Sequence, residues 1–345
     1  MSLPSGTFQE SYAQDMAIFR TRTQWFLLLL FLVLLFTIPL YASNTILTLS
    51  TIIGITIISV LGLNILTGCC GQISMGHSGF MAVGGYVLAI LSAKLGWPFW
   101  VALPAAGLIS GLIGILFGLP SLKIKGFYLI MATVAAYFII IWLILQLRNI
   151  TGGTDGLSVP QARIGALIIK EKTAYFYLVM GIACVATYLA KNIIRTRAGR
   201  AFIAIRDNDL AAEVMGVNLW IYKLQAFFIG CVFAGVAGGL SVLYLSFANV
   251  EQFPFINSIW YLGMLIVGGM GSTSGVIFGV IAIKLLDQFA TRVGPLLANI
   301  VNPQAAVGLS LILTGLVIIL FLVYEPRGIA HLWDRVKNYY RLWPF

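Results

Sequence analysis

Residues 195–223, RTRAGRAFIAIRDNDLAAEVMGVNLWIYK, hold a large group of charged side chains. Eight of the 32 charged residues fall in this window, and long apolar runs flank it on both sides. We therefore expect a water-exposed island between membrane spans. The chemistry open to such a segment is charged and hydrogen-bonded contact, so we predict that it meets a soluble partner. The eight charged residues are Arg195, Arg197, Arg200, Arg206, Asp207, Asp209, Glu213 and Lys223.

The same window has helical order of its own. Phe202 and Ile205 share one face at i, i+3 spacing, which predicts a short helix that packs through these two side chains. Any of the polar residues at 207–209 could cap a second short helix, and Gly216 could end it. We expect a folded, amphipathic segment rather than an extended loop.

A second polar stretch, residues 64–86 (NILTGCCGQISMGHSGFMAVGGY), interrupts the apolar pattern after the second apolar run. Its candidate substrate-path residues are Ser74, His77 and Ser78. One interpretation is a tight cytoplasmic turn with a capped helix start. The other is a discontinuous helix at membrane depth, which is tolerated only where it lines protein or water and which often forms transporter sites. Free N–H groups at the start of such a half-helix can bind a polar substrate group.

Residues 267–279, VGGMGSTSGVIFG, repeat this theme. Met270–Gly275 parallels Met75–Gly79 with one extra residue, and both segments follow one apolar run and open the next. The pattern suggests an internal repeat of two related halves.

Two further features carry polar side chains. Lys284 and Asp287 are i, i+3 neighbours in an apolar run, and ionisable residues in a span are functional candidates, although a mutually neutralising pair is the alternative. No acidic relay runs through the other apolar runs, which weakens a proton-coupled mechanism.

Residues 148–161, RNITGGTDGLSVPQ, contain turn signals and form the largest external surface, where an outside partner could bind. Asp155 is interpreted there as a turn residue.

Several catalytic patterns are missing from the sequence. It has no GxxxxGK[ST], no HExxH, no nucleophile elbow and no Cys/His metal spacing. We predict that the chain is not an enzyme and does not itself bind ATP through a P-loop or a metal. The four cysteines are interpreted as small packing residues. They are Cys69, Cys70, Cys184 and Cys231.

Composition places these segments in a membrane. The 345 residues are 60% hydrophobic and only 9% charged, whereas soluble domains carry about 25% charged residues. An all-α polytopic membrane protein follows. The net charge of +10 is scattered over short loops, which indicates orientation signals and contacts with membrane lipid rather than nucleic acid.

A span needs about 20 apolar residues, and the pattern predicts about ten spans, with eight or nine as alternatives. Placing the N-terminus inside puts fourteen of the 21 Lys and Arg residues in the cytoplasm and six outside. This bias predicts cytoplasmic N- and C-termini and a cytoplasmic position for 195–223. Residues 1–24 do not form a cleavable signal and are expected to lie in the cytoplasm or at the interface. The predicted spans are 25–42, 46–66, 78–95, 98–119, 127–147, 174–191, 222–245, 256–270, 273–292 and 305–324.

Small residues recur at three- or four-residue intervals in several predicted spans, which predicts a compact bundle because close backbone approach replaces the hydrophobic drive in lipid. The clearest series are Gly107, Gly111, Gly114 and Gly118, then Gly235, Gly238 and Gly239, then Gly271, Gly275 and Gly279.

Four motifs together resemble a known family. LTGCCGQISMGHSGFMAVGGYVLAIL, LPSLKIKGFYLIMATVA, TGGTDGLSVP and AIRDNDLAAEVMGVNLWIYKLQAFFIGCVFAGVAGGL occur in the order seen in LivM-type permeases. These proteins are inner-membrane subunits of branched-chain (hydrophobic) amino acid ABC importers. The similarity covers nearly all of residues 25–325, and it implies the ABC importer permease fold, with a permease domain at 25–325 and a cytoplasmic tail at 326–345.

The resemblance also implies partners. They are a second, LivH-type permease subunit, two P-loop ATPase subunits that hold the ATP and magnesium, and a periplasmic substrate-binding protein. Such importers use a cytoplasmic loop whose short helix docks in a groove of the ATPase. Here residues 195–218 would be this coupling loop, although Leu210 replaces the Glu of the family pattern. The coupling candidates are Arg200, Phe202, Arg206, Asp207, Ala211, Ala212, Glu213 and Gly216.

The implied function is ATP-driven import of branched-chain or other small amino acids across the bacterial inner membrane by alternating access. Movement of the 197–216 segment would rock the spans on either side. Related permeases serve amides, urea or small aromatic or carboxylic acids, which remain alternatives. A secondary transporter would need coupling-ion carboxylates, for which only Asp287 qualifies. A subunit of a respiratory-type complex would need cofactor ligands or a run of buried Lys and Glu residues, which the sequence lacks.

Overall fold

The fold was analysed in a computed structural model. It describes residues 22–122, 124, 126–161, 163, 164, 167, 168, 171–298, 312, 315–321, 323–325 and 327–342. The predicted N-terminal segment 1–24 therefore lies outside the described residues except for its last three, which begin the first helix.

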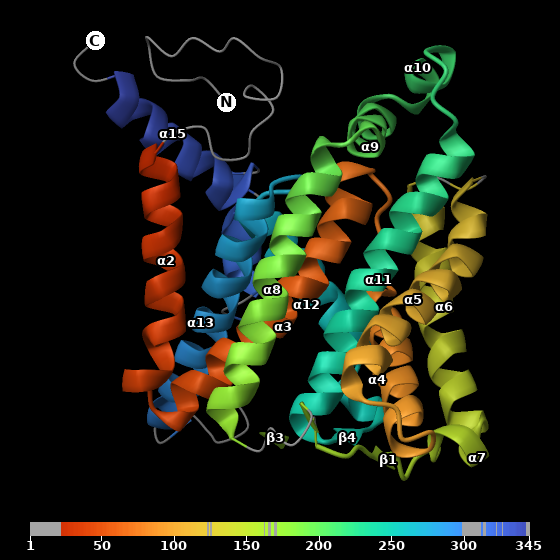
Figure 1. Cartoon of the computed structure of the whole chain (residues 1–345). Helices are drawn as coiled ribbons and strands as arrows, with labels where there is room; N and C mark the ends of the chain where they lie inside the picture. Colours follow the sequence, from red (N-terminus) through yellow and green to blue (C-terminus); the bar gives the residue numbers. More distant parts are fainter. Residues whose placement is uncertain are drawn as a thin grey trace.

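Long helices make up almost all of the described chain (Figure 1). The first residue of each of the first nine predicted spans lies within three residues of the first residue of a helix. This agreement confirms the all-α polytopic class. The predicted tenth span is helical over 315–321 and otherwise lies largely outside the described residues. The nine helices are α2 (Arg22–Tyr41), α3 (Asn44–Leu63), α4 (His77–Ala93), α5 (Phe99–Gly118), α6 (Phe127–Gln146), α8 (Lys172–Arg195), α11 (Leu219–Leu245), α12 (Phe255–Gly268) and α13 (Thr273–Ala298).

Short elements lie at the two ends of this bundle. One end carries α9 (Arg197–Asp207), α10 (Asp209–Val214) and α15 (Gly328–Leu342), and α2 begins there too (Figure 1). The opposite end carries α7 (Arg148–Thr151) and two small antiparallel sheets, β1 (Leu157–Ser158) with β4 (Phe247–Ala248) and β2 (Arg163–Ile164) with β3 (Leu167–Ile168). The 3-10 turns are η2 (Leu119–Leu122) and η3 (Val250–Gln252). Both outermost described helices therefore reach the α9–α10 end.

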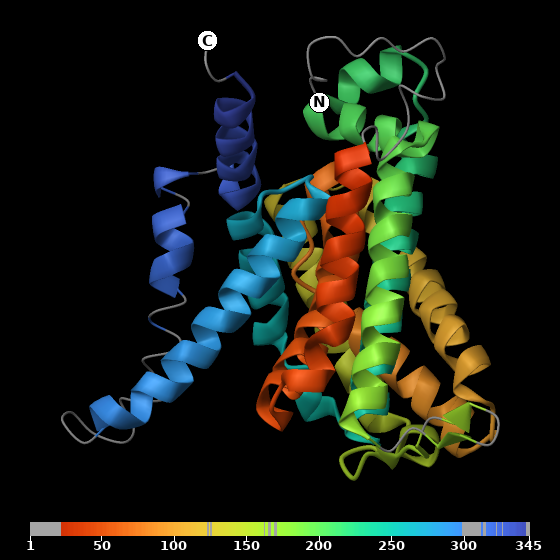
Figure 2. The same cartoon turned by 60° about the vertical axis from the view of Figure 1, so that its left-hand side comes forward.

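Among the described residues, six helical segments are long and apolar enough to cross a membrane, and two shorter apolar helices, Trp25–Tyr41 and His77–Ala93, accompany them. The predicted eighth span is the 14-residue α12, which is too short to cross alone at about 1.5 Å per residue. Figure 2 shows α2 beside α8, where Phe36 stacks on Tyr177 with ring centroids 6.0 Å apart, and α13 leaning away from the bundle.

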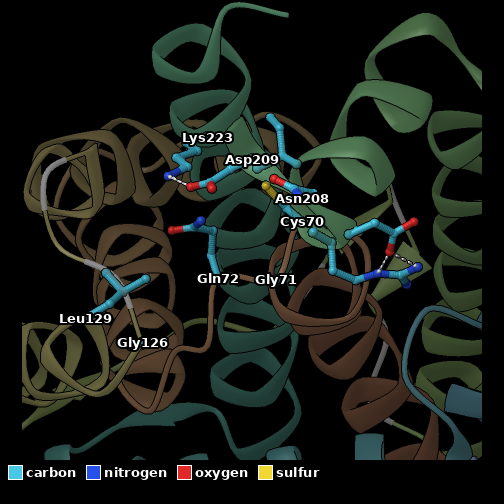
Figure 3. Close-up of a pocket in the computed structure, with 11 residues that line it drawn as sticks. Cys70, Gly71, Gln72, Gly126, Leu129, Asn208, Asp209 and Lys223 are labelled. Atoms are coloured by element: carbon cyan, nitrogen blue, oxygen red, sulfur yellow. Dashed lines mark hydrogen bonds and ion pairs between the residues drawn. The ribbon is translucent and has the colours of Figure 1, made fainter. Parts of the chain in front are cut away.

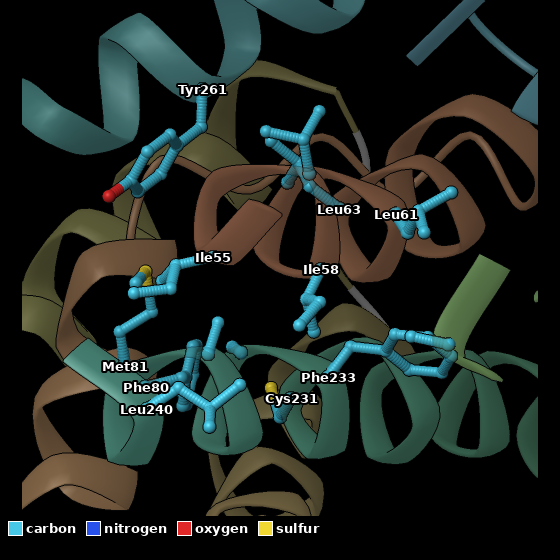
Figure 4. Packing of buried hydrophobic residues seen from close by; sticks show 14 of the residues in the cluster. Ile55, Ile58, Leu61, Leu63, Phe80, Met81, Cys231, Phe233, Leu240 and Tyr261 are labelled. Atoms are coloured by element: carbon cyan, nitrogen blue, oxygen red, sulfur yellow. The ribbon is translucent and has the colours of Figure 1, made fainter. Parts of the chain in front are cut away.

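Close backbone contacts join α11 to α3, α4 and α5, and glycines make them. A Cβ at Gly114 of α5 would lie 2.5 Å from Cys231 Sγ, and one at Gly62 of α3 would lie 2.5 Å from the Gly230 carbonyl oxygen. The sequence expectation of glycine-mediated packing is therefore confirmed at these crossings. Figure 4 shows Ile58 of α3 pointing toward the helix that carries Cys231 and Phe233, which is α11.

The chain breaks its helical pattern between α3 and α4. A π-helix, η1 (Asn64–Cys69), ends α3, and residues 71–76 then run without regular structure to His77. His77 Nε2 donates to the carbonyl oxygen of Ser59, ten residues before Cys69, so α4 starts beside α3 and not beyond its end. Met75 N donates to Thr133 Oγ1 of α6 at 3.0 Å. Ser59 of α3 and Thr133 of α6 therefore contact the start of α4, while Gly71 and Ile73 are exposed, so the tight turn and the discontinuous helix both stay predictions.

Candidate functional site

The predicted coupling segment folds as two capped helices at one end of the bundle. Thr196 Oγ1 accepts from Gly199 N at 3.3 Å and caps α9. Among the three capping candidates at 207–209, Asn208 caps α10, because its Oδ1 accepts from Ala211 N at 3.1 Å. Gly216 adopts φ +85° two residues after the end of α10 and reverses the chain. The segment therefore holds its shape through its own caps.

The inner face of the segment is anchored to the bundle. Phe202 is fully buried and meets Tyr222 of α11 edge-on, with ring centroids 6.3 Å apart. Ile205 and Ala212 are buried as well. Two of the predicted coupling residues, Phe202 and Ala212, thus hold α9 and α10 in place and do not face outward.

The outer face of α10 is apolar and exposed. Leu210 is 66% exposed, Val214 87% and Met215 83%. The predicted contact residues Arg200, Ala211 and Glu213 are exposed as well. Sequence reasoning treated Leu210 only as a departure from a pattern and missed Val214 and Met215. Leu210 and Val214 are spaced i, i+4 shortly before Gly216, and this spacing was the available signal.

Arg206 connects the coupling segment to the end of α3. Its Nη1 donates to the carbonyl oxygen of Gly68 at 3.1 Å, and its Nε and Nη2 donate to Asp207 Oδ1 at 3.0 and 2.8 Å. Its aliphatic part lies over Gly71, where an added Cβ would be 3.2 Å from Arg206 Cγ. Arg206 and Asp207 therefore form contacts within the chain, in addition to any that they make with a partner.

The glycine-rich turn between α12 and α13 meets the same point. Asn64 Oδ1 accepts from Gly271 N at 2.8 Å, and a Cβ at Gly68 would lie 2.6 Å from that nitrogen. The two segments suspected of being internal copies make different contacts: His77 donates to Ser59 of α3, whereas Gly271 donates to Asn64 of η1. A two-half repeat stays a prediction.

Ser74, His77 and Ser78 lie together at the buried start of α4, and all three are fully enclosed. His77 Nε2 donates to the Ser59 carbonyl oxygen at 2.9 Å, and Ser78 N donates to Ser258 Oγ of α12 at 2.9 Å. Ser74 Oγ, Ser78 Oγ and His77 Nδ1 are buried without a hydrogen-bond partner among the described residues. Buried polar atoms without partners are costly, so this cluster is a candidate for contact with substrate or water.

Comparison with known families now decides which kind of membrane protein this is. The family described as "Branched-chain amino acid transport system / permease component" matches residues 44–322, which include the coupling segment, the α4 start and both glycine-rich turns. The chain belongs to this permease family.

Individual relatives agree. The chain is 29% identical over 315 residues to the high-affinity branched-chain amino acid transport system permease protein LivM of Salmonella typhimurium, covering 84% of this chain and 71% of that protein. It is 29% identical over 333 residues to LivM of Escherichia coli, covering 90% and 75%. A probable LivM of Methanocaldococcus jannaschii is 28% identical over 243 residues, covering 66% and 67%. No solved structure matches the chain. The protein is a LivM-type permease.

The remaining polar candidates of this permease lie apart from the two clusters. Lys284 is partly buried on α13 and Asp287 is exposed, and a neutralising pair between them stays a prediction. Asp155 is exposed in a turn and its N–H donates to the Gly152 carbonyl oxygen at 3.2 Å. Within the described ranges no group of three His, Cys, Asp or Glu residues could hold a metal, and the four cysteines are free.

Proposed function

We propose that this permease is a membrane subunit of an ATP-driven importer of branched-chain amino acids, and that α10 is its coupling helix. The supporting observation is the combination of an exposed apolar tip at Leu210, Val214 and Met215 with an inner face fixed by Phe202. Exposed apolar patches rimmed by polar residues mark protein interaction sites. Glu213, exposed next to Val214 in the chain, supplies a polar group at the edge of the apolar tip.

The proposed assembly contains this chain, a LivH-type permease, two P-loop ATPase subunits and a periplasmic substrate-binding protein, in the bacterial inner membrane. ATP and magnesium bind to the ATPase subunits. The α9–α10 end faces the cytoplasm, together with both termini. The distribution of Lys and Arg residues over the loops supports this orientation.

A continuous set of contacts supports a route for the movement. Movement of α10 would be transmitted along the chain to Arg206. Arg206 donates a hydrogen bond to the Gly68 carbonyl oxygen at the end of α3. The irregular segment 71–76 then leads from there to His77 and α4. Displacement of α9 would therefore shift the buried start of α4, where Ser74, His77 and Ser78 lie along the proposed substrate path. Alternation between outward and inward access follows from that shift.

Transport in proteoliposomes tests the proposed function. The permease is co-purified with the subunits that accompany it, reconstituted, and given binding protein and labelled leucine outside and ATP inside. We expect leucine uptake that needs ATP and magnesium. Uptake by the isolated permease without ATP would contradict the proposal and favour a secondary transporter. Competition by unlabelled amides, urea or aromatic acids separates the alternative substrates.

Thiol labelling tests the substrate path. In a chain whose four cysteines are replaced by Ala, a Ser74→Cys variant is expected to be unreactive at rest, because Ser74 is fully buried. During ATP turnover the labelling rate with a small hydrophilic thiol reagent should rise by at least about tenfold, since the path must admit water and substrate.

Ser110→Cys is the matched control. Ser110 is equally buried, but its Oγ donates to the Phe80 carbonyl oxygen at 2.8 Å within the packed α4–α5 contact. It should stay unlabelled in every state. Equal labelling of both positions would indicate general loosening, and no labelling of Ser74→Cys during uptake would remove Ser74 from the path.

A further inference from the structure

A cavity of about 350 Å³ lies between the coupling segment and the end of α3 (Figure 3). One wall is formed by Cys70, Gly71 and Gln72, and by the start of α6 at Gly126 and Leu129. The other wall is formed by α9, α10 and the first turn of α11, from Ile205 to Asp209 and at Lys223. Its volume is at the small end of ligand sites, about 300–1,000 Å³.

Lys223 is the first group in this cavity that lacks a full set of partners. Its side chain is only 2% exposed, and its ammonium faces Asp209 Oδ2 at 3.8 Å. That distance is an ion pair but too long for a hydrogen bond. An ammonium has three N–H donors, and the described residues accept none of them. Burying such a group is costly unless a further partner arrives.

Gln72 is the second such group. Its side chain is 7% exposed, and its Oε1 is enclosed without a hydrogen-bond donor among the described residues. Figure 3 shows the Gln72 side chain extending toward Lys223 and Asp209. The cavity therefore offers a cation, an anion and a free acceptor on one side. Leu129 and Ile205, both buried, give it an apolar side.

We propose that this cavity binds a free amino acid with an aliphatic side chain and that occupancy slows transport. The ligand's carboxylate would accept from Lys223, and its ammonium would contact Asp209 and Gln72 Oε1. The side chain would lie against Leu129 and Ile205. Among the described lining residues, Arg206 and Lys223 balance Asp207 and Asp209, which fits a zwitterion better than a simple anion or cation.

The effect on transport follows from the two walls. One wall belongs to the α3 end and α6, and the other moves with the coupling segment in the proposed function, on which this inference rests. A ligand bound to both walls would stabilise their present spacing and oppose displacement of α9. Amino acid accumulating on the α9–α10 side would then inhibit its own import.

The test measures initial uptake of labelled leucine into proteoliposomes of the whole transporter with ATP inside. The lumen is preloaded with unlabelled leucine, N-acetyl-leucine or leucinamide. We expect leucine alone to slow uptake, because each analogue lacks one of the two charges. Gln72→Leu keeps the side-chain size but removes the acceptor. In this variant, about tenfold more internal leucine should be needed to slow uptake to the same extent. Gln146→Leu, an exposed glutamine at the other end of the bundle, is the matched control.

Equilibrium dialysis of the detergent-purified permease against labelled leucine gives a second readout that needs no transport. Binding should weaken in Gln72→Leu and be lost in Lys223→Met, with size-exclusion profiles to confirm that the variants are folded. Uptake that is insensitive to internal leucine, or a Gln72→Leu variant that matches Gln146→Leu, would overturn the inference. Absence of ATP-driven uptake in empty vesicles would instead refute the proposed function, and dialysis would still decide the site.

Discussion

Val214→Asp is expected to abolish ATP-driven uptake while leaving the permease folded. Val214 is 87% exposed at the tip of α10 and makes no core contact that the substitution would remove. In the proposed complex its side chain enters an apolar groove of the ATPase, where an unpaired carboxylate would lose its hydration. A central contact of this kind is worth about 2 kcal/mol or more, or at least about thirtyfold in affinity. Co-purification of the ATPase subunits and the uptake rate measure the effect.

Two controls separate docking from general damage. Val214→Ile keeps an apolar side chain and should retain both the ATPase subunits and uptake. Val336→Asp makes the same change on α15, at the same end of the bundle, where Val336 is 48% exposed. It should leave uptake near wild type. If Val214→Asp still co-purifies and transports normally, α10 is not the docking surface.

The sequence predicts the helices and the coupling segment because both depend on local patterns. Apolar runs of about 20 residues set the helix positions, and the caps of α9 and α10 lie within three residues of the groups that they bind. Phe202 and Ile205 were expected to share a packing face, and both are buried. These features need no knowledge of distant residues.

The contacts that give the site its organisation join distant residues. Arg206 was expected to meet a partner, yet it donates to Gly68, 138 positions away. The cavity combines residues of five segments, and the unpaired state of Gln72 depends on what surrounds it in space. The start of α4 is likewise held by contacts of its first turn with α3 and α12. A single sequence carries no periodic signal for such pairs.

The glycine contacts of α11 lead to the second large prediction, that Gly238→Ala will prevent stable folding. Alanine is the better helix former by about 1 kcal/mol, so an open site would gain stability. At Gly238, however, an added Cβ would overlap the carbonyl oxygen of Met81, and the backbone of α4 cannot yield as a flexible side chain could. Forced separation of α4 from α11 should cost about 3 kcal/mol or more. Thermal unfolding in detergent and the amount of monodisperse protein recovered from membranes measure the loss.

Gly181→Ala makes the same chemical change, but it is expected to leave the stability of the protein unchanged or to raise it. Gly181 lies inside α8, and an added Cβ there would meet nothing within 4 Å. Helix propensity then decides the outcome, and the midpoint of thermal unfolding should stay the same or rise slightly. If both variants are equally stable, close approach of α4 and α11 through Gly238 does not hold the bundle together. If both are equally destabilised, the cause is sensitivity of the membrane helices to any added methyl group, and the packing argument for α11 fails as well.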